Sequence, residues 1–260
     1  MDLNAIQNVA IGAAYAGAGV LSGYFGSTGG VHKKGPNDLV TDADLESQQQ
    51  IVAAIREKYP DHAVMAEEEG LHNEESTRCQ WIIDPLDGTT NFAHGIPIFA
   101  VSIAFAHENT TRVGVVLSPI SGELFTAVEG RGAAVNNSTA AVSPESEISE
   151  SLLVTGFPYD FQPIVQTVME RFQKCLLSAR GIRRLGAAAL DLCYVACGRF
   201  EGFWEQGLKP WDTAAGALIV REAGGRVTDF SGNPHNPDKN EILATNGRIH
   251  DTICSLLKAG

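Results

Sequence analysis

The chain has 260 residues, of which 44% are hydrophobic and 19% charged, and these ordinary globular values exclude a disordered, collagen-like or coiled-coil protein. Its 31 acidic and 19 basic side chains give a formal net charge of −12. Such a chain cannot neutralise a row of phosphates, which argues against direct nucleic-acid binding and against an anionic membrane surface. An anionic substrate would need a local positive charge, and bound metal ions are the obvious source.

The first predicted element is a helix over residues 3–25, which includes an apolar run at residues 9–21. No Lys or Arg precedes Lys33, so this run lacks the basic front end of a signal peptide. It is also shorter than the roughly 20 apolar residues that a membrane span needs. We therefore expect a helix packed closely on its neighbours in a cytoplasmic protein. The five cysteines do not suggest a disulfide framework, because the number is odd and the chain is long.

The next elements mix helix and strand. A second helix is predicted over residues 42–58, with Thr41 or Asp42 as its cap. Short strands are expected at Ala63–Ala66 and Gln80–Asp84, with a polar surface loop between them. An antiparallel meander follows at 98–107, 112–118 and 122–128, and residues 136–150 carry no clear pattern.

The second half of the chain again mixes strands with helices. The predicted strands are 151–156, 181–184, 200–204, 226–229 and 241–245, and the predicted helices are 163–177, 187–197, 210–223 and 248–258. A central meander among mixed elements favours α+β layers over alternating βαβ units. We expect one domain over residues 1–260, with an α+β half at about 1–150 and an α/β half at about 151–260.

The densest chemical signal is WIIDPLDGTTNF at residues 81–92. A buried strand ends near Asp84, and Gly88 permits a sharp turn. Asp84 and Asp87 can converge on one point across this turn, with the carbonyl of Leu86 between them. Oxygen ligands from side chains and backbone suit a hard cation such as Mg²⁺.

The end of this segment can form an anion site. The spacing and sequence context of its Asp residues also exclude two other classes of enzyme. Thr89, Thr90 and Asn91 can cap a short helix whose N-terminal amides face an anion. A haloacid-dehalogenase-type phosphatase needs two Asp two residues apart, and an aspartic protease needs Asp-Thr-Gly; neither fits here. The remaining alternative is an Asp-rich turn with ordinary capping.

Three further acidic segments are weak signals when each is taken alone. Glu67-Glu68-Glu69 can be a solvated loop, and Asp212 can complement a helix dipole in the first turn of its helix. The acids of DLVTDAD at residues 38–44 can simply cap the second helix.

Taken together and in this order, these segments resemble the inositol monophosphatase family of metal-dependent, lithium-sensitive phosphomonoesterases. The two family signatures are residues 81–92 and WDTAAG at 211–216, and similar stretches lie at 38–44, 66–70, 114–133 and 221–225. The resemblance covers essentially the whole chain. It implies a layered αβαβα sandwich of the inositol monophosphatase and fructose-1,6-bisphosphatase type, in agreement with the mixed pattern above.

The resemblance also implies a set of metal ligands. Glu67, Asp84 and the carbonyl of Leu86 would hold a first Mg²⁺, and Asp84, Asp87 and Asp212 a second. Glu67 would also reach a third, weaker ion through water. These motifs contain no His or Cys, which favours Mg²⁺, with Mn²⁺ as a possible substitute, over Zn²⁺.

The catalytic and substrate residues follow from the same resemblance. A metal-activated water, oriented by Thr89 paired with Asp44 and assisted by Glu67, would attack phosphorus directly and in line. The implied substrate contacts are Asp87, Gly88, Thr89, the backbone of Ala188, Glu205 and Asp212. Glu205 has the alternative of being a plain surface residue.

The sequence leaves the roles of several basic residues undecided. The resemblance implies that either Lys33 or Lys34 approaches the metal site and that Lys209 lies at a position that tunes the substrate. Arg183 and Arg184 belong either to the mouth of the site or to a subunit interface.

The first hypothesis is a Mg²⁺-dependent phosphatase that converts inositol 1-phosphate to inositol and phosphate. Fructose-1,6-bisphosphatase or dual activity, histidinol-phosphatase and nucleotide 3′-phosphatase are the alternatives within the superfamily. A regulatory protein that binds a partner on the same fold is the hypothesis from a different class, because some relatives touch the transcription machinery. Relatives are usually dimers, so a homodimer is expected by analogy.

Overall fold

The computed structural model describes residues 1–26, 31–33, 39–68, 70–72, 78–158, 162–237 and 239–258, with backbone alone at 31–33, 39–40 and 70–72. The α-helices in these ranges are α1 (Leu3–Tyr24), α2 (Asp42–Lys58), α3 (Thr89–Ala93), α4 (Val165–Ser178), α5 (Ala188–Ala196), α6 (Pro210–Glu222) and α7 (His250–Leu257). Short 3-10 turns lie at Ile148–Glu150 and Gln162–Ile164.

The larger sheet has the strand order β10-β9-β8-β7-β6-β5-β3-β4. Its strands are β3 (Ala63–Ala66), β4 (Gly70–His72), β5 (Cys79–Asp87), β6 (Ala100–His107), β7 (Thr110–Ser118), β8 (Glu123–Val128), β9 (Ala133–Val135) and β10 (Ser138–Ala140). From β5 to β10 consecutive strands pair antiparallel, so the predicted meander is confirmed and extended. β3 joins β5 in parallel and β4 antiparallel.

The smaller sheet has the order β12-β11-β13-β15-β14. Its strands are β11 (Leu152–Thr155), β12 (Gly181–Arg183), β13 (Gly202–Gln206), β14 (Arg226–Thr228) and β15 (Glu241–Thr245). β11 runs parallel to β12 and β13, and β15 runs antiparallel to β13 and β14. A separate hairpin pairs β1 (Val31–Lys33) with β2 (Leu39–Thr41).

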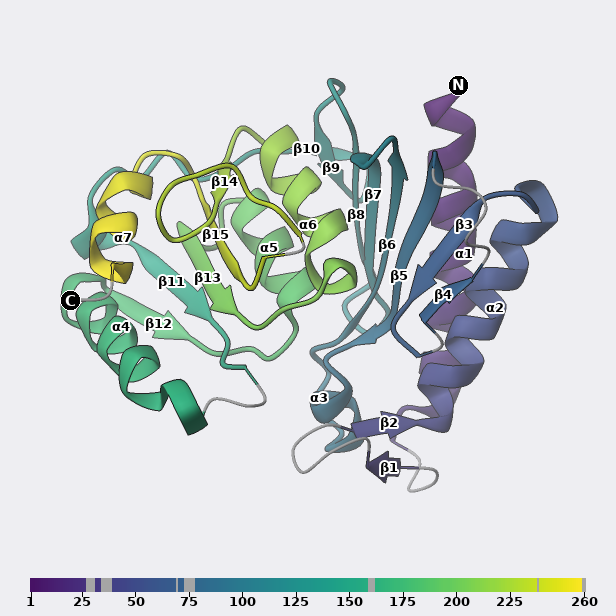
Figure 1. Cartoon of the computed structure of the whole chain (residues 1–260), viewed down its shortest axis with the longest axis horizontal. Coiled ribbons are helices and arrows are strands. Elements are labelled where there is room, and N and C mark those ends of the chain that lie inside the picture. Colours follow the sequence, from purple (N-terminus) through teal and green to yellow (C-terminus); the bar gives the residue numbers. More distant parts are fainter. Residues whose placement is uncertain are drawn as a thin grey trace.

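The elements form five layers, which Figure 1 shows edge-on. Helices α1 and α2 cover the outer face of the larger sheet, and α4 and α7 cover the outer face of the smaller sheet. Helices α5 and α6 lie between the two sheets. The predicted αβαβα sandwich is therefore confirmed.

The sequence of β5 and α6 explains why both are central. On β5, Trp81 and Ile83 belong to the core beneath α1 and α2, whereas Ile82 belongs to the core around α5 and α6. A strand that is apolar at consecutive positions is suited to a sheet covered on both faces. In α6 the whole stretch 213–220 is buried, as expected for a helix with layers on both sides. Gly114 of β7 lets α6 approach closely, because a side chain there would lie 2.7 Å from the carbonyl oxygen of Ala215.

Helix α1 is long and apolar enough to cross a membrane when only length and composition are considered, and it is the one such helix among the described residues. In this fold it packs against α2 and the larger sheet, with Ala10, Ala13, Gly17 and Leu21 on its buried side. The predicted close packing on neighbouring elements is confirmed.

The β1–β2 hairpin, the β9–β10 hairpin and strand β4 appear where the sequence predicted no strand. β9 and β10 form a hairpin whose turn is Asn136-Asn137, and both residues have positive φ, 46° and 64°. Asn adopts positive φ more readily than most residues and is common in two-residue hairpin turns. The Asn-Asn dipeptide therefore indicated a hairpin, although the polar composition of this stretch showed no strand pattern. β4 lies inside the predicted surface loop and pairs with β3. The prediction of a surface loop there was therefore wrong at residues 70–72.

Candidate active site

A cavity of about 200 Å³ opens at the junction of the two sheets. Its wall is formed by the end of β5, the start of α3, the N-termini of α5 and α6, and the end of β13. All of the predicted site residues except Asp44 line it: Glu67, Asp84, Leu86, Asp87, Gly88, Thr89, Ala188, Glu205 and Asp212. Asp44 lies fully buried behind this wall.

A bulge in β5 directs Asp84 and Asp87 into the same cavity. On a regular strand, residues three apart point to opposite faces of the sheet. Here Asp84 pairs with Ser102 and Asp87 with Ala100, so β5 has one residue more than β6 over this interval. Such an insertion re-aims the side chains that follow it. The Asp84 carboxylate also accepts a hydrogen bond from the Leu86 amide at 2.9 Å, which stabilises the bulged segment.

Gly88 ends this segment in a conformation that other residues rarely adopt. Its φ is 95°, and a side chain there would lie 2.9 Å from the carbonyl oxygen of Ile98. Helix α3 then begins at Thr89. The turn predicted at Gly88 is present, although β5 extends to Asp87 rather than ending near Asp84.

Thr89 is connected to Asp44 through a buried chain of hydrogen bonds. The Thr89 hydroxyl lies 3.2 Å from one carboxylate oxygen of Asp44 and 3.0 Å from the Leu86 carbonyl oxygen. The other Asp44 oxygen accepts from the Thr41 amide at 2.7 Å and from the Thr41 hydroxyl at 2.5 Å. Burial raises the pKa of Asp44 to about 6, although these hydrogen bonds favour the ionised form.

Asp87 and Asp212 are also bound to backbone amides. The two Asp87 oxygens accept from the amides of Ala188 and Ala189 at 3.1 and 2.8 Å, which caps the N-terminus of α5. Asp212, in the first turn of α6, accepts from the Lys209 amide at 2.7 Å. Asp87 thus connects the larger sheet to a helix of the central layer.

Burial and mutual repulsion disfavour the ionised forms of the cavity carboxylates. Burial, followed by repulsion from Glu67, Asp87 and Asp212, raises the pKa of Asp84. Burial raises the pKa of Asp87 and of Asp212 to about 7. Burial, with repulsion from Asp212, raises the pKa of Glu205 to about 8. Clustered acids with raised pKa values are typical of functional sites and are relieved by positive charge.

The oxygen donors of the cavity wall suit a hard divalent cation. The wall offers carboxylates and the Leu86 carbonyl, and it contains neither His nor Cys. Within the described ranges, no three His, Cys, Asp or Glu side chains already stand in an arrangement that could hold a metal ion. The hydrogen bonds that Asp87 and Asp212 accept from backbone amides do not prevent metal binding, because each carboxylate can accept about four hydrogen bonds or metal contacts.

Two basic residues, Arg184 and Lys209, line the cavity among the described residues. Arg184 had two possible locations from sequence, and the structure places it at the cavity. Arg183 is exposed and is not part of this wall. Lys34 lies outside the described residues, and so does the side chain of Lys33.

Asn91 has a role that the sequence did not reveal. Its amide nitrogen donates to the carbonyl oxygens of Ile98 at 2.8 Å and Leu185 at 2.9 Å. Asn91, in α3, therefore connects the loop before α5 to the segment just before β6. The signal was its place inside the 81–92 signature, where only a capping role had been considered.

Comparisons with known proteins agree with this geometry. A sequence profile of the Inositol monophosphatase family matches residues 2–259, and the chain belongs to that family. It is 44% identical to a Haemophilus influenzae protein named Nus factor SuhB over 254 residues, 96% of this chain and 95% of that protein. It is 41% identical to a Synechocystis inositol-1-monophosphatase over 259 residues, 99% of this chain and 90% of that protein.

Solved structures show the same fold. The inositol monophosphatase from Anabaena superposes with a TM-score of 0.91 at 41% identity, covering 99% of this chain and 96% of that one. The Bartonella henselae extragenic suppressor protein suhB superposes with a TM-score of 0.95 at 40% identity, covering 98% and 99%.

Proposed function

We propose that this protein is a Mg²⁺-dependent phosphatase that hydrolyses inositol 1-phosphate to inositol and phosphate. The observation that carries the proposal is one cavity lined by Glu67, Asp84, Asp87 and Asp212 together with Thr89. Membership of the inositol monophosphatase family supports it. We assign Glu67, Asp84, Leu86, Asp87 and Asp212 as the residues that would hold two or three Mg²⁺ ions, with Mn²⁺ as a possible substitute.

Bound Mg²⁺ would supply charge neutralisation for the phosphate dianion and would lower the pKa of a water molecule. The chain's own contribution to the attack is the pair of Thr89 and Asp44. A hydroxyl has one proton, so when Thr89 donates to Asp44 its lone pairs are left to accept a proton from a water molecule. With a pKa of about 6, Asp44 is mostly ionised at neutral pH and can take up the proton that Thr89 passes on. Glu67 is assigned to the same catalytic group.

The other wall of the cavity would bind the alcohol part of the substrate. Glu205, Asp87 and Asp212 are acceptors for hydroxyl groups, and the backbone at Gly88, Thr89 and Ala188 completes the proposed substrate contacts. Several acceptors around a cavity of about 200 Å³ suit a compact polyol. Fructose 1,6-bisphosphate, histidinol phosphate and nucleoside 3′,5′-bisphosphates are the alternative substrates.

Four further assignments belong to this proposal. We infer a cytoplasmic homodimer that is inhibited by lithium, as the family resemblance implies. No direct contact with nucleic acid is expected, because the net charge is −12.

A second candidate function follows from the relatives that are named Nus factor SuhB, such as the H. influenzae protein. In that case the chain would regulate a protein partner, and hydrolysis would be incidental. An acidic protein can bind a basic patch on another protein. Mg²⁺ dependence separates the two functions, because turnover requires the ions and a scaffold would bind its partner with or without them.

The test is phosphate release with Mg²⁺ from inositol 1-phosphate, fructose 1,6-bisphosphate, histidinol phosphate and a nucleoside 3′,5′-bisphosphate. The proposal expects a strong preference for inositol 1-phosphate and no release after chelation. A different preferred ester would change the substrate assignment, and no release from any of them would favour the partner-binding function.

A further inference from the structure

Helix α2 carries three fully buried polar side chains: Asp44, Ser47 and Gln48, which we call the polar stripe. Their spacing places them on one side of the helix. The other buried residues of α2 are Ala43, Ile51 and Ile55, which pack in the core beneath α1 and α2. Burying polar groups on such a helix costs free energy unless each group has a partner, so their partners show what the stripe does.

Each member of the stripe contacts a different segment of the active site. Asp44 accepts from the Thr89 hydroxyl at 3.2 Å, as described above. The Ser47 hydroxyl donates to the carbonyl oxygen of Pro85 at 3.0 Å. The side-chain oxygen of Gln48 accepts from the Glu68 amide at 3.1 Å. One rigid helix thus holds the bulge of β5, the start of α3 and the segment after β3.

Ser47 and Gln48 bind the backbone at two places beyond the end of the ladder between β3 and β5. The parallel ladder between β3 and β5 ends at Ala66 paired with Ile83, and the last bond beside it is from the Glu67 amide to the Ile83 carbonyl at 3.2 Å. Gln48 binds the next amide along, that of Glu68. Ser47 likewise binds inside the bulge, between Asp84 and Leu86.

We propose that Gln48 and Ser47 are positioning residues that fix the spacing between the segment of Glu67 and the segment of Asp84 for binding a divalent cation. The inference rests on the proposed function, since it concerns the same metal ligands. Like-charged carboxylates repel, so segments without these two bonds would relax apart. The cation would then have to draw them together again, at a cost to its affinity.

The decisive variant is Gln48→Met, which keeps the length of the side chain and removes the acceptor. Gln49→Met is its matched control, because Gln49 is the next residue of the same helix and faces solvent. Both are made in the full chain, stripped with chelator and titrated with MgCl₂ by calorimetry. We expect Gln48→Met to weaken Mg²⁺ binding by roughly tenfold or more and Gln49→Met to leave it unchanged. At saturating Mg²⁺ the kcat of Gln48→Met should recover to within a few-fold of wild type.

Two further variants separate positioning from folding. Gln48→Glu retains an acceptor oxygen for the Glu68 amide. We therefore expect it to bind Mg²⁺ with wild-type affinity or better, in contrast to Gln48→Met. Ser47→Ala removes the bond to Pro85 and should weaken Mg²⁺ binding in the same direction. Melting temperatures are recorded without metal for all variants.

The outcomes are distinguishable. If Gln48→Met melts lower but its folded fraction binds Mg²⁺ like wild type, Gln48 is only structural and the inference is overturned. Equal affinities for Gln48→Met and Gln49→Met also overturn it. If the wild-type protein itself binds no Mg²⁺, the proposed function fails instead, before any variant is compared.

Discussion

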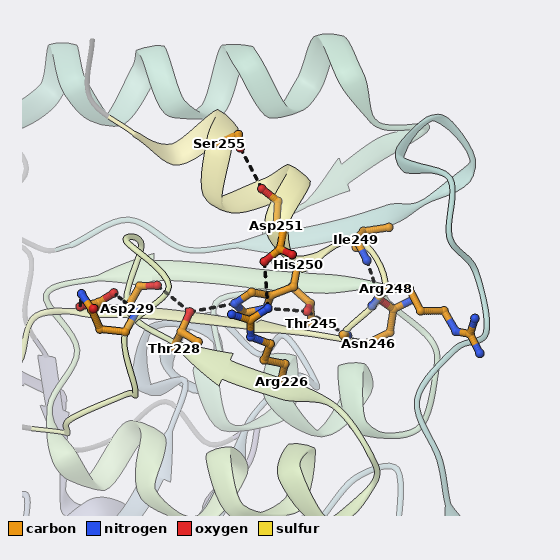
Figure 2. Close-up of polar contacts among 12 residues, drawn as sticks. Arg226, Thr228, Asp229, Thr245, Asn246, Arg248, Ile249, His250, Asp251 and Ser255 are labelled. Atoms are coloured by element: carbon orange, nitrogen blue, oxygen red, sulfur yellow. Dashed lines mark hydrogen bonds and ion pairs between the residues drawn. The ribbon is translucent and has the colours of Figure 1, made fainter.

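Two buried polar clusters of the described residues have opposite character. In the cavity, Asp84, Asp87 and Asp212 repel one another and have raised pKa values. On the far side of the smaller sheet, the cluster around His250 has no such conflict. Figure 2 shows His250, at the start of α7, between Thr228 of β14 and Thr245 of β15.

The hydrogen bonds around His250 define a neutral ring. The Thr228 hydroxyl donates to the Asp229 carbonyl at 2.6 Å, so it accepts from the Nε2–H of His250 at 2.9 Å. Thr245 accepts from the Gly247 amide at 3.0 Å and can donate to Nδ1 of His250 at 2.8 Å. Each donor then has an acceptor, and the proton lies on Nε2.

The contrast indicates which cluster is shaped by folding and which by function. A satisfied neutral cluster stabilises the fold by itself. Clustered carboxylates lower the stability of the protein alone and are relieved by a cation. We therefore expect changes in the cavity to alter activity more than stability, and changes around His250 to do the reverse.

The largest expected effect is that of Asp87→Asn on turnover. The change removes one charge of the metal-binding set, and kcat/KM for the phosphate ester should fall by roughly 10²–10³-fold. From sequence alone this variant is expected to leave the fold intact, but Asp87 also caps α5 through Ala188 and Ala189. Asn keeps one acceptor oxygen for these two amides, so the loss of one hydrogen bond, about 1 kcal/mol, opposes the stability gained by removing a buried charge, and the net change in stability should be small. Asp61→Asn, at an exposed site, is the control. Full activity of Asp87→Asn would show that the cavity carboxylates are not needed for turnover.

Thr89→Ala should have the next largest effect. It removes the hydroxyl that links Asp44 to the cavity, and kcat should fall by roughly 10²-fold. Thr89→Ser keeps the hydroxyl and should retain most of the activity. Equal losses in both variants would show that the methyl group, and not the proton relay, is what the reaction needs.

The cavity should also give the metal-free protein an unusual pH dependence. Asp87 and Asp212 have pKa values of about 7 when folded, against 3.8 when unfolded, so the folded state holds protons that the unfolded state releases. Their contribution to stability is fully present below about pH 4 and is lost as the pH rises through 7. Urea unfolding in chelator should therefore show this loss, on the order of a few kcal/mol, and Mg²⁺ should raise stability more at pH 8 than at pH 5. An equal Mg²⁺ effect at both pH values would contradict the raised pKa values.

The sequence allowed prediction of the ligands but not of what holds them. Asp84, Leu86 and Asp87 lie within one short segment, so their convergence follows from local spacing. Ser47 and Gln48 bind Pro85 and Glu68, 38 and 20 residues away in the chain, and nothing in their local sequence indicates those partners.

The same limit applies to the fold. The meander and the apolar run 213–220 could be predicted, because periodicity and strand order are local properties. The bulge that directs Asp84 and Asp87 to one side depends on pairing with β6, and the capping of α5 by Asp87 depends on the packing of the two halves. These contacts arise only when distant segments meet, so a single sequence does not reveal them.

The smallest effect we predict is at His250, and its pH dependence has the opposite sign. Burial lowers the pKa of His250 to about 4, from 6.5. The folded state then binds fewer protons than the unfolded state between these values, so the stabilising contribution is present above pH 6.5 and is lost as the pH falls toward 4. In saturating Mg²⁺, which counters the cavity carboxylates, His250→Gln should reduce this acid-side loss by on the order of 2 kcal/mol, with activity within about twofold of wild type.

His94→Gln, at an exposed histidine, is the control for this measurement and should leave the unfolding profile unchanged. Because the two clusters shift stability in opposite directions with pH, one set of unfolding curves with and without Mg²⁺ tests both. If His250→Gln instead reduced kcat more than stability, the cluster would be coupled to the cavity across the smaller sheet. The separation of a structural cluster from a functional one would then be wrong.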